Sequence, residues 1–504
     1  MERHSSRPAV ASIALIALVA FAFAFQGSRG LWEPDEGRYT NIATQMLRSH
    51  NFVEPAWNDD FSHFAKPPLS YWAVAGGVTL LGWNEWGARA PNAVAFALTV
   101  LLVLALGRRV TPGRPWLAAL VYALALLPYG AANIITTDTL LTLWETVAML
   151  GFLCWHQAGG ERTAWRWLLL MWGGFGLAFL TKGPPGLLPL LALVVFLGLV
   201  DGRASVRRLF DPRGLLTFAV VGFSWYAVVL VRRPELLRYF LHDEVVGRIA
   251  SGQHHRNAAW YGALTTYVPT FLVGFMPWTV FLLRPLRRAG NLLRATWWRA
   301  EARERPMRVL ALLWVLVPLA VFALSRSRLP LYVLPLFVPL SLLLAQRWET
   351  TRIPWRAAGW ALAAWCLLLV GGRRAASAVA SPQDSRPLAR AIAALPGETP
   401  SEIVFVDDRP SWALSLYLGA EVELVYLRRP WTSEAQSFEE ELLEHEPHLL
   451  YVVRGRQESR FARLAEDRGL VVERVGGLGD RGFFRLRETA AARQGEAASS
   501  VPPS

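Results

Sequence analysis

Residues 30–47, GLWEPDEGRYTNIATQML, follow directly after an apolar run and open a new helical pattern. Asp35, Glu36 and Arg38 crowd together at the point where a membrane span would end. Acidic residues in a first turn complement the helix dipole, so an ordinary helix start explains this stretch when it is taken alone. A simple membrane anchor would finish with a basic residue, however, and the stretch therefore also suggests an active site at the exit of a span.

The composition indicates a polytopic membrane protein. The 504 residues are 53% hydrophobic and include 23 tryptophans, which is unusual for a soluble chain. The first apolar run, 10–25, follows Arg3 and Arg7 as in a signal peptide, but no convincing small-residue cleavage site precedes the charged helix. We therefore interpret this run as a retained first helix.

Apolar runs long enough to cross a bilayer recur along most of the chain. A hydrocarbon core of about 30 Å needs roughly 20 residues of helix. Eleven spans are predicted, near residues 8–26, 88–107, 115–133, 139–156, 165–181, 184–200, 214–231, 260–283, 308–325, 329–346 and 357–371.

The basic residues determine the predicted orientation. Arginines cluster in short loops between the apolar runs, and the segment 284–307 carries the densest positive charge. Cytoplasmic loops are enriched in Lys and Arg, so we place the N-terminus inside and both the Asp35 loop and the C-terminal region outside. The net charge of +13 thus reflects loops that face anionic lipid and does not indicate nucleic acid as a partner. The two cysteines lie inside apolar runs, which argues against a disulfide framework.

Three segments outside the membrane stand out. Residues 27–87 form a long first outer loop with two helical patterns, and 232–259 form a second outer region. After the last span, the β-patterns SEIVFVDD, EVELVYL and HLLYVVRG alternate with helical ones, as in a small α/β unit with a largely parallel sheet. The predicted fold is therefore mainly α, with a transmembrane domain at 1–371, an extracytoplasmic α/β domain at 372–487 and a disordered tail at 488–504.

Two further residues are candidates for a site with Asp35. Lys66, in the stretch KPPLSYW, either snorkels to the interface or supplies a point charge for a lipid phosphate at a rigid Pro-Pro helix start. Asp138, in TTDTLLTLW, either caps the following helix or contributes a second carboxylate. All three fall on the outer side in the predicted topology, so side chains from distant segments could line one cavity.

Other polar residues near the outer face allow a structural and a functional interpretation. Lys182 stands at a Gly-Pro break, where a turn is the simpler explanation. Arg326, Arg328 and Tyr332 either anchor a helix at the interface or add to a basic rim for an anionic headgroup. The histidines and acidic residues of 232–259 lack a tight ligand spacing such as HExxH, so we predict no metal site. Phosphate loops of the P-loop or dinucleotide type are absent, as is a GxSxG elbow.

The order of the motifs resembles a known family. Six motifs succeed one another over roughly residues 8–346: EPDEGRYTNIATQML, KPPLSYW, GARAPNAV, TTDTLLTLW, LTKGPPGLLPLL and SRSRLPLYVLPLF. This series resembles the bacterial aminoarabinose-transferase and protein mannosyltransferase-like membrane glycosyltransferases, which are C-type (GT-C) enzymes that use polyprenyl-phosphate sugars. The resemblance implies a multi-pass protein of the bacterial inner membrane, and the C-terminal α/β unit is similar in general layout to the periplasmic domain that such enzymes often carry.

The resemblance also implies roles for individual residues. Asp35 becomes the catalytic carboxylate of the first outer loop and Asp138 the second, with Glu36 beside Asp35 in the catalytic motif. Binding of the lipid-linked substrate is implied for Arg38, Tyr39, Lys66, Arg248 and Tyr332. One position departs from the family, because Ala65 stands before the KPPL lysine where aminoarabinose transferases usually have Glu. A metal held by that Glu and a histidine is therefore not predicted.

Sugar transfer from a lipid phosphate agrees with these residue types. Such a donor has an activated anomeric carbon and a charged leaving group, so the enzyme needs a base for the acceptor hydroxyl and positive charge for the departing phosphate. Asp35 can provide the base, and Lys66 with arginines the positive charge. In-line attack would invert the anomeric carbon, and no nucleotide or redox cofactor is required.

The sequence leaves several functions open. The acceptor is lipid A, another glycolipid, a polysaccharide, or a Ser/Thr side chain as in protein O-mannosyltransferases. A flippase or transporter of lipid-linked sugars is an alternative of another class, although its charges would line a path through the bilayer and here they gather at one face. A membrane scaffold whose outer domain binds a partner would leave the first outer loop unexplained.

Overall fold

The chain forms two compact units. The computed structural model describes residues 6–158, 161–240, 257–281, 289–351, 353–428, 436–441 and 448–488. The first unit, here called the helical unit, consists of Met1–Ser28, Ala65–Ala73 and Arg89–Ala378. The second, called the sheet unit, consists of Arg29–Phe64, Val74–Ala88 and Val379–Ser504.

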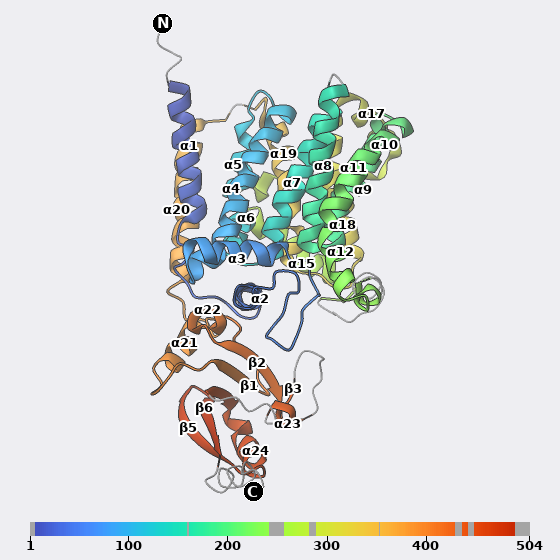
Figure 1. The fold of residues 1–504 in the computed structure, drawn as a ribbon. Coiled ribbons are helices and arrows are strands. Elements are labelled where there is room, and N and C mark those ends of the chain that lie inside the picture. The colour runs from blue at the N-terminus through green and yellow to red at the C-terminus, as the bar shows by residue number, and fades with distance from the viewer. Residues whose placement is uncertain are drawn as a thin grey trace. The chain divides into compact units, whose positions relative to one another are not determined.

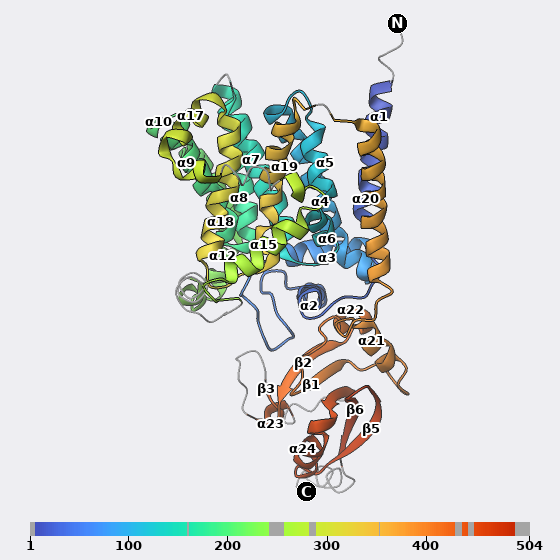
Figure 2. The same ribbon diagram turned by 180° about the vertical axis from the view of Figure 1, so that it is seen from behind.

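Mostly apolar helices make up the helical unit, and many of them run side by side (Figures 1 and 2). Its helices are α1 (Ser6–Phe23), α4 (Glu85–Val110), α5 (Trp116–Leu124), α6 (Leu126–Ala131), α7 (Thr137–His156), α8 (Glu161–Lys182), α9 (Leu188–Val200), α10 (Arg203–Leu209), α11 (Pro212–Gly222), α12 (Ser224–Arg232), α13 (Leu236–Arg238), α15 (Gly262–Gly274), α17 (Ala295–Glu304), α18 (Pro306–Leu324), α19 (Phe337–Trp348) and α20 (Trp355–Ala376). The described residues also include the 3₁₀ segments η1 (Pro184–Leu187), η3 (Ala289–Leu293) and η4 (Pro330–Leu336). The chain passes between the units within α4 and within α3 (Leu69–Leu81).

Four helical segments of the described chain are long and apolar enough to cross a membrane, namely Glu85–Val110, Pro306–Leu324, Pro330–Trp348 and Trp355–Ala376. The pair α11 and α12, bent by 51°, adds a fifth if it is counted as one span. The predicted class, a mainly helical membrane protein, is thus confirmed, whereas the predicted number of eleven spans is not. The apolar run at 115–133 is one reason, because the extended backbone of Ala125 divides it into α5 and α6.

Small residues bring α7 and α8 into close contact. A Cβ atom on Gly151 would lie 2.6 Å from the backbone nitrogen of Met171, and one on Gly174 would lie 2.8 Å from that of Ala148. Glycines allow this approach, which is typical of helix pairs in membranes, where packing replaces the hydrophobic effect between helices. The two glycines therefore fix the distance between the helices that carry Asp138 and Lys182.

The sheet unit contains a six-stranded sheet in the order β3-β2-β1-β4-β6-β5. The strands are β1 (Glu402–Val406), β2 (Glu421–Tyr426), β3 (Gln436–Ser437), β4 (Leu449–Arg454), β5 (Leu470–Leu478) and β6 (Arg481–Glu488). The first four are parallel, as predicted for the three of them that the sequence identified, whereas β6 runs antiparallel to both β4 and β5. The β5–β6 hairpin was not predicted, because a bulge near Gly476 interrupts its alternating pattern.

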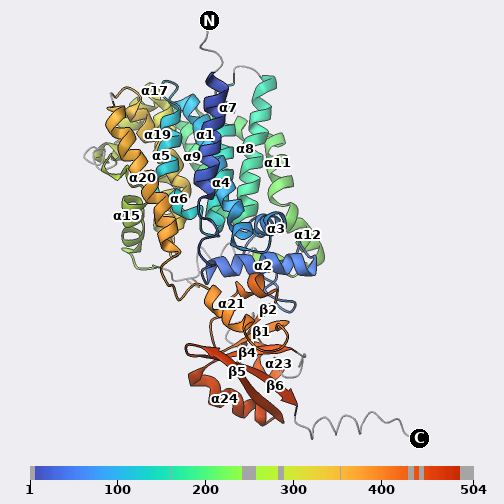
Figure 3. The same cartoon turned by 90° about the vertical axis from the view of Figure 1, so that its left-hand side faces the viewer.

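Helices cover both faces of this sheet (Figure 3). Ile403 and Phe405 of β1 pack against α21 (Arg386–Ala393) and α22 (Leu414–Leu418). Val404 and Val406 alternate with them and pack on the other side, in a cluster with residues of α23 (Phe438–Glu441) and α24 (Gly455–Glu466). The unit also includes α2 (Asp35–Ser49), where the Thr44 hydroxyl donates to Ser415 Oγ of α22 over 3.0 Å. The residues that begin the first outer loop are therefore built into the same unit as the sheet.

Candidate functional site

The predicted site residues divide between the two units. The motif after the first span lies on α2 in the sheet unit and contributes Asp35, Glu36, Arg38 and Tyr39. Those of the helical unit are Lys66, Asp138 and Tyr332. The predicted binding residue Arg248 lies outside the described residues.

Asp138 lies at the start of α7 and is buried, with 5% of its surface exposed. The alternative prediction that it caps this helix is wrong, because the Thr136 hydroxyl is the cap and accepts from the Asp138 backbone nitrogen over 3.4 Å. Thr136 has the extended backbone that an N-cap residue needs, whereas Asp138 already belongs to the helix. The Asp138 carboxylate instead forms an ion pair with the Lys182 ammonium.

Lys182 is the last residue of α8 and reaches back to this carboxylate. Gly183, with φ of +74°, ends the helix and directs the chain into η1, as expected from the Gly-Pro break. The Lys182 Nζ atom also lies 4.3 Å from the centre of the Tyr332 ring in η4, a cation–π contact. Three segments that are distant in the sequence thus meet at one ammonium group.

A second carboxyl group belongs to the same cluster. Glu145 lies seven residues after Asp138, so both side chains share one face of α7. It is 4% exposed, and Lys182 and Asp138 are its electrostatic neighbours. Burying ionised groups in a helical membrane protein costs free energy, and such groups usually mark functional sites. The strongest candidate site in the helical unit is therefore the group that we name the lysine cluster. It consists of Asp138, Glu145, Lys182 and Tyr332.

The sequence contained a signal for Lys182 that our predictions did not use. Among the 52 lysines and arginines of the chain, only Lys66 and Lys182 are lysines. Each stands before a proline pair, in KPP and KGPP. An ammonium is a compact point charge that the planar guanidinium does not reproduce, so a chain that otherwise uses arginine retains lysine where this shape matters. Lys66 is half-buried and lies just before α3.

Asp35 is the first residue of α2, and 52% of its side chain is exposed. It forms an ion pair with Arg38, one turn further along the helix. This position agrees with the ordinary helix-start interpretation, since an acidic first turn complements the dipole. It also leaves the carboxylate accessible, as a group that must meet an external substrate requires.

Glu36 is in a different environment from its neighbour. It is 1% exposed, and its carboxylate accepts from both terminal nitrogens of Arg29, over 2.5 and 3.2 Å, and from the Trp32 backbone nitrogen over 2.9 Å. Such a bidentate ion pair fixes geometry strongly. Glu36 therefore holds the turn that precedes α2, and Tyr39 is buried on the same helix.

The α/β fold holds the loop of Asp35 in place through Glu33. The Oε1 atom of Glu33 accepts from the Ala413 backbone nitrogen over 2.9 Å and from the Ser385 hydroxyl over 3.2 Å. Burial raises the pKa of Glu33 to about 7. The Leu31 backbone nitrogen donates to the Tyr417 hydroxyl over 2.9 Å. The sheet unit thus positions the segment that leads into α2.

Arg328 does not belong to a basic rim, contrary to one of the two interpretations of its motif. It is 5% exposed and donates to the backbone oxygens of Asn257, Ala259 and Ala323 over 2.8 to 2.9 Å. These hydrogen bonds from the Arg328 guanidinium join the chain segment at Asn257 and Ala259 to the end of α18. In the described part of the chain, no three His, Cys, Asp or Glu side chains gather as metal ligands would.

Comparison with known proteins agrees with the motif series. Residues 10–237 match the family described as dolichyl-phosphate-mannose-protein mannosyltransferase. The chain is 33% identical over 321 residues to the undecaprenyl phosphate-alpha-4-amino-4-deoxy-L-arabinose arabinosyl transferase of Erwinia tasmaniensis, a match that covers 63% of this chain and 55% of that protein. It is also 33% identical over 344 residues to the protein of the same name from Pseudomonas aeruginosa (strain PAO1), covering 67% and 59%. The match thus spans less than two thirds of these relatives.

A solved structure has the same fold. The crystal structure of ArnT from Cupriavidus metallidurans bound to undecaprenyl phosphate superposes with a TM-score of 0.75 at 21% identity, covering 94% of this chain and 97% of that one. Both the sequence match and the fold therefore confirm the predicted resemblance to aminoarabinose-transferase and mannosyltransferase-like membrane glycosyltransferases.

Proposed function

Because this chain resembles the aminoarabinose transferases in sequence and has the fold of one of them, we propose that it is an inverting glycosyltransferase of the bacterial inner membrane. It moves a sugar from a polyprenyl-phosphate donor to an extracytoplasmic acceptor, which is lipid A, another glycolipid or a polysaccharide. In this proposal the N-terminus is cytoplasmic, whereas the sheet unit is extracytoplasmic. The names of the relatives, which specify undecaprenyl phosphate and an arabinosyl transfer, support this donor class.

The lysine cluster is the observation that carries the proposal. The Asp138 carboxylate and the Tyr332 ring contact Lys182 inside a helical membrane unit, and the buried carboxyl group of Glu145 lies on the same face of α7 as Asp138. A buried ion pair of this kind contributes little to stability, since desolvation offsets most of the Coulomb attraction. An ammonium held in place by such neighbours suits a reaction whose leaving group is a phosphate, because it stabilises negative charge where that charge develops.

The residues of the two units have separate roles in the proposed reaction. Asp35 accepts the proton of the acceptor hydroxyl, or orients the acceptor if it is itself a phosphate. Glu36 supports this carboxylate by fixing the turn before α2, while Arg38 and Tyr39 contribute to substrate binding. Lys66, Tyr332 and Arg248 bind the lipid-linked phosphate, and Asp138 holds Lys182. Attack of the acceptor oxygen breaks the anomeric carbon–phosphate oxygen bond, so the polyprenyl phosphate leaves with that electron pair and the configuration inverts. No cofactor is required.

A protein acceptor is the second candidate. The family match of residues 10–237 names a protein mannosyltransferase, which favours transfer to Ser or Thr. Both candidates use the same donor chemistry and differ only in the group that attacks.

The proposal is tested by adding radiolabelled polyprenyl-phosphate sugars to membranes with and without the protein. We expect protein-dependent label in the glycolipid or polysaccharide fraction. Label in the protein fraction would establish the second candidate. If no sugar of a broad donor panel, including aminoarabinose, were transferred to any fraction while the protein moved the donor across vesicles, the chain would be a flippase.

A further inference from the structure

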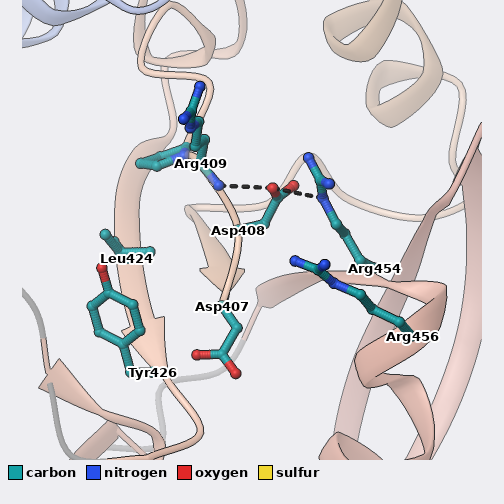
Figure 4. Close-up of a pocket in the computed structure, with 8 residues that line it drawn as sticks. Asp407, Asp408, Arg409, Leu424, Tyr426, Arg454 and Arg456 are labelled. Atoms are coloured by element: carbon teal, nitrogen blue, oxygen red, sulfur yellow. Dashed lines mark hydrogen bonds and ion pairs between the residues drawn. The ribbon is translucent and has the colours of Figure 1, made fainter. Parts of the chain in front are cut away.

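An open cavity of about 560 Å³ lies at one edge of the sheet in the sheet unit (Figure 4). Its lining includes Asp407, which follows β1, Tyr426, which ends β2, and Arg456 at the start of α24. Cavities of several hundred Å³ with a few polar groups are typical of small-molecule sites. None of these residues takes part in the roles proposed above.

The sheet topology places this cavity where ligands usually bind in parallel sheets. The central strand β1 pairs in parallel with β2 on one side and with β4 on the other. The chain therefore leaves β1 in one direction and later returns on its opposite side, which is a topological switch point. Ligands bind beyond the carboxyl ends of the strands at such points. The same edge also holds the N-terminus of α24, where the helix dipole favours an anion.

An ion network forms the floor of the cavity. The Asp408 carboxylate is buried and accepts from Arg481 Nε over 2.7 Å and from the Arg409 backbone nitrogen over 2.8 Å. The Nε atom of Arg454 lies 2.7 Å from the same carboxylate. The two guanidinium groups share the Asp408 carboxylate, and Arg454 Nη1 also lies 3.8 Å from the Asp480 carboxylate, so the charges within the network are balanced. Asp408 is fully engaged by these neighbours and is not available to a ligand.

Arg456 provides an unused charge. Its guanidinium extends into the cavity (Figure 4), and it has no hydrogen-bond or ion-pair partner in the described part of the chain. It is exposed, so its conformation is not needed to hold the fold together. The planar fork of arginine matches a phosphate, to which it can donate two parallel hydrogen bonds.

The opposite wall of the cavity is suited to a sugar. Asp407 is half-buried, and its Oδ1 atom accepts from the Leu427 backbone nitrogen over 3.3 Å, which leaves acceptor capacity for hydroxyl groups. Leu424 and Tyr426 add apolar and aromatic surface beside it. A purely anionic ligand would be repelled by Asp407, whereas a molecule with both a phosphate and hydroxyl groups satisfies both walls.

We propose that this cavity binds a phosphorylated sugar, with its phosphate on Arg456 and its hydroxyl groups on Asp407. The ligand is either a soluble sugar phosphate or the headgroup of a phosphorylated glycolipid, since both present the same groups. The binding step does not depend on the transferase activity proposed above, and it is measured without any donor.

The test is calorimetric titration of the full-length protein in detergent with glucose 1-phosphate, inorganic phosphate and glucose. Saturable binding of glucose 1-phosphate, tighter than that of either fragment, is the expected result. Arg456→Glu should weaken it at least about tenfold, because a bidentate charge contact becomes a repulsion. Asp407→Asn should weaken glucose 1-phosphate but not inorganic phosphate. Arg463→Glu is the matched control, since this exposed arginine lies on the same helix and is not part of the cavity lining.

Three results would overturn the proposal: no saturable binding, equal loss in Arg456→Glu and Arg463→Glu, or equal affinity for phosphate and glucose 1-phosphate. An unchanged melting temperature in Arg456→Glu assigns its effect to the site itself. A further titration with lipid A in the same detergent distinguishes a glycolipid headgroup from a soluble sugar phosphate as the ligand. Tighter binding of lipid A that is lost in Arg456→Glu supports the glycolipid headgroup, and binding no tighter than that of glucose 1-phosphate supports a soluble ligand.

Discussion

Asp138 and Lys182 form an ion pair that joins the start of α7 to the end of α8, and Tyr332 covers its cation. The same two helices approach each other closely further along, at Gly151 and Gly174. Glu145 adds a second buried carboxyl group on the same face of α7. The helical unit therefore buries an ion pair beside a further carboxyl group, an arrangement whose cost is difficult to explain by stability alone.

The variant Lys182→Met tests whether this ammonium serves the reaction. Removing one partner of a buried pair should destabilise the protein by about 3–5 kcal/mol, and sugar transfer should fall by roughly 100-fold or more because charge stabilisation of the leaving phosphate is lost. Melting temperature and transfer rate are both measured in detergent.

The double variant Asp138→Asn with Lys182→Met separates the two effects. It removes both charges, so the melting temperature should recover most of the loss while the transfer rate stays low. Recovery of transfer together with stability would mean that the pair has only a structural role.

Asp35 and Glu36 are neighbours for which we expect opposite results. Glu36→Gln loses the charge that Arg29 needs in a buried setting, and it should lower the free energy of unfolding by about 3 kcal/mol. Asp35→Asn changes an exposed group and should leave the melting temperature within about 1–2 °C of wild type. Thermal unfolding followed by tryptophan fluorescence compares the two, and a stable Glu36→Gln protein would contradict the structural role assigned to Glu36.

Glu33 should make the stability of the sheet unit depend on pH. Burial raises its pKa to about 7, above the pKa of a glutamate in the unfolded chain. At pH values between these two pKa values, the native state therefore keeps a proton on Glu33 that the unfolded state has lost. The stabilising contribution is complete below about pH 4 and is lost as the pH rises through 7, by up to roughly 3 kcal/mol. Melting temperatures from pH 5 to 8 should therefore fall.

Glu33→Gln is the matched variant for this pH dependence. A neutral amide cannot ionise, so the decline between pH 5 and 8 should become shallower, although burial also raises the pKa of Glu421 to about 7 and leaves a residual slope. An unchanged pH profile in Glu33→Gln would exclude Glu33 as a source.

The contact between α7 and α8 predicts a steric effect. Gly174→Val would place side-chain atoms within 3 Å of Ala148 and should abolish the folded protein or lower its yield severely. Gly198→Ala on α9 is the control, because no atom lies within 4 Å of its added Cβ. Detergent size-exclusion profiles distinguish the two, and a monodisperse Gly174→Val protein would contradict the described packing.

The sequence predicted the fold where the pattern was local. Apolar runs and the period-2 pattern of Ile403, Val404, Phe405 and Val406 depend on neighbouring residues only, so the helical class and three parallel strands were predicted correctly. The β5–β6 hairpin was missed because its pairing includes a bulge, and the broken spans because hydropathy does not report an extended residue such as Ala125.

The site was predictable only in part, because it depends on long-range contacts. The sequence identified Asp138 but assigned it either a cap or a catalytic role, and its partner Lys182 lies 44 residues away. Glu145 is hidden within an apolar run, and nothing local reveals that its carboxyl group is an electrostatic neighbour of Lys182. The scarcity of lysine was the one sequence signal that pointed to this partner. Whether Asp35 and Asp138 act on one substrate stays a prediction.

The first measurement to make is the rate of sugar transfer from a polyprenyl-phosphate donor by purified wild type, Asp35→Asn and Asp60→Asn. Asp60 provides a matched control, since it is an exposed carboxylate of the same loop with no proposed role. We expect Asp35→Asn to be at least about 100-fold slower than wild type at an unchanged melting temperature, and Asp60→Asn to retain its activity. Full activity in Asp35→Asn would show that this carboxylate only begins a helix.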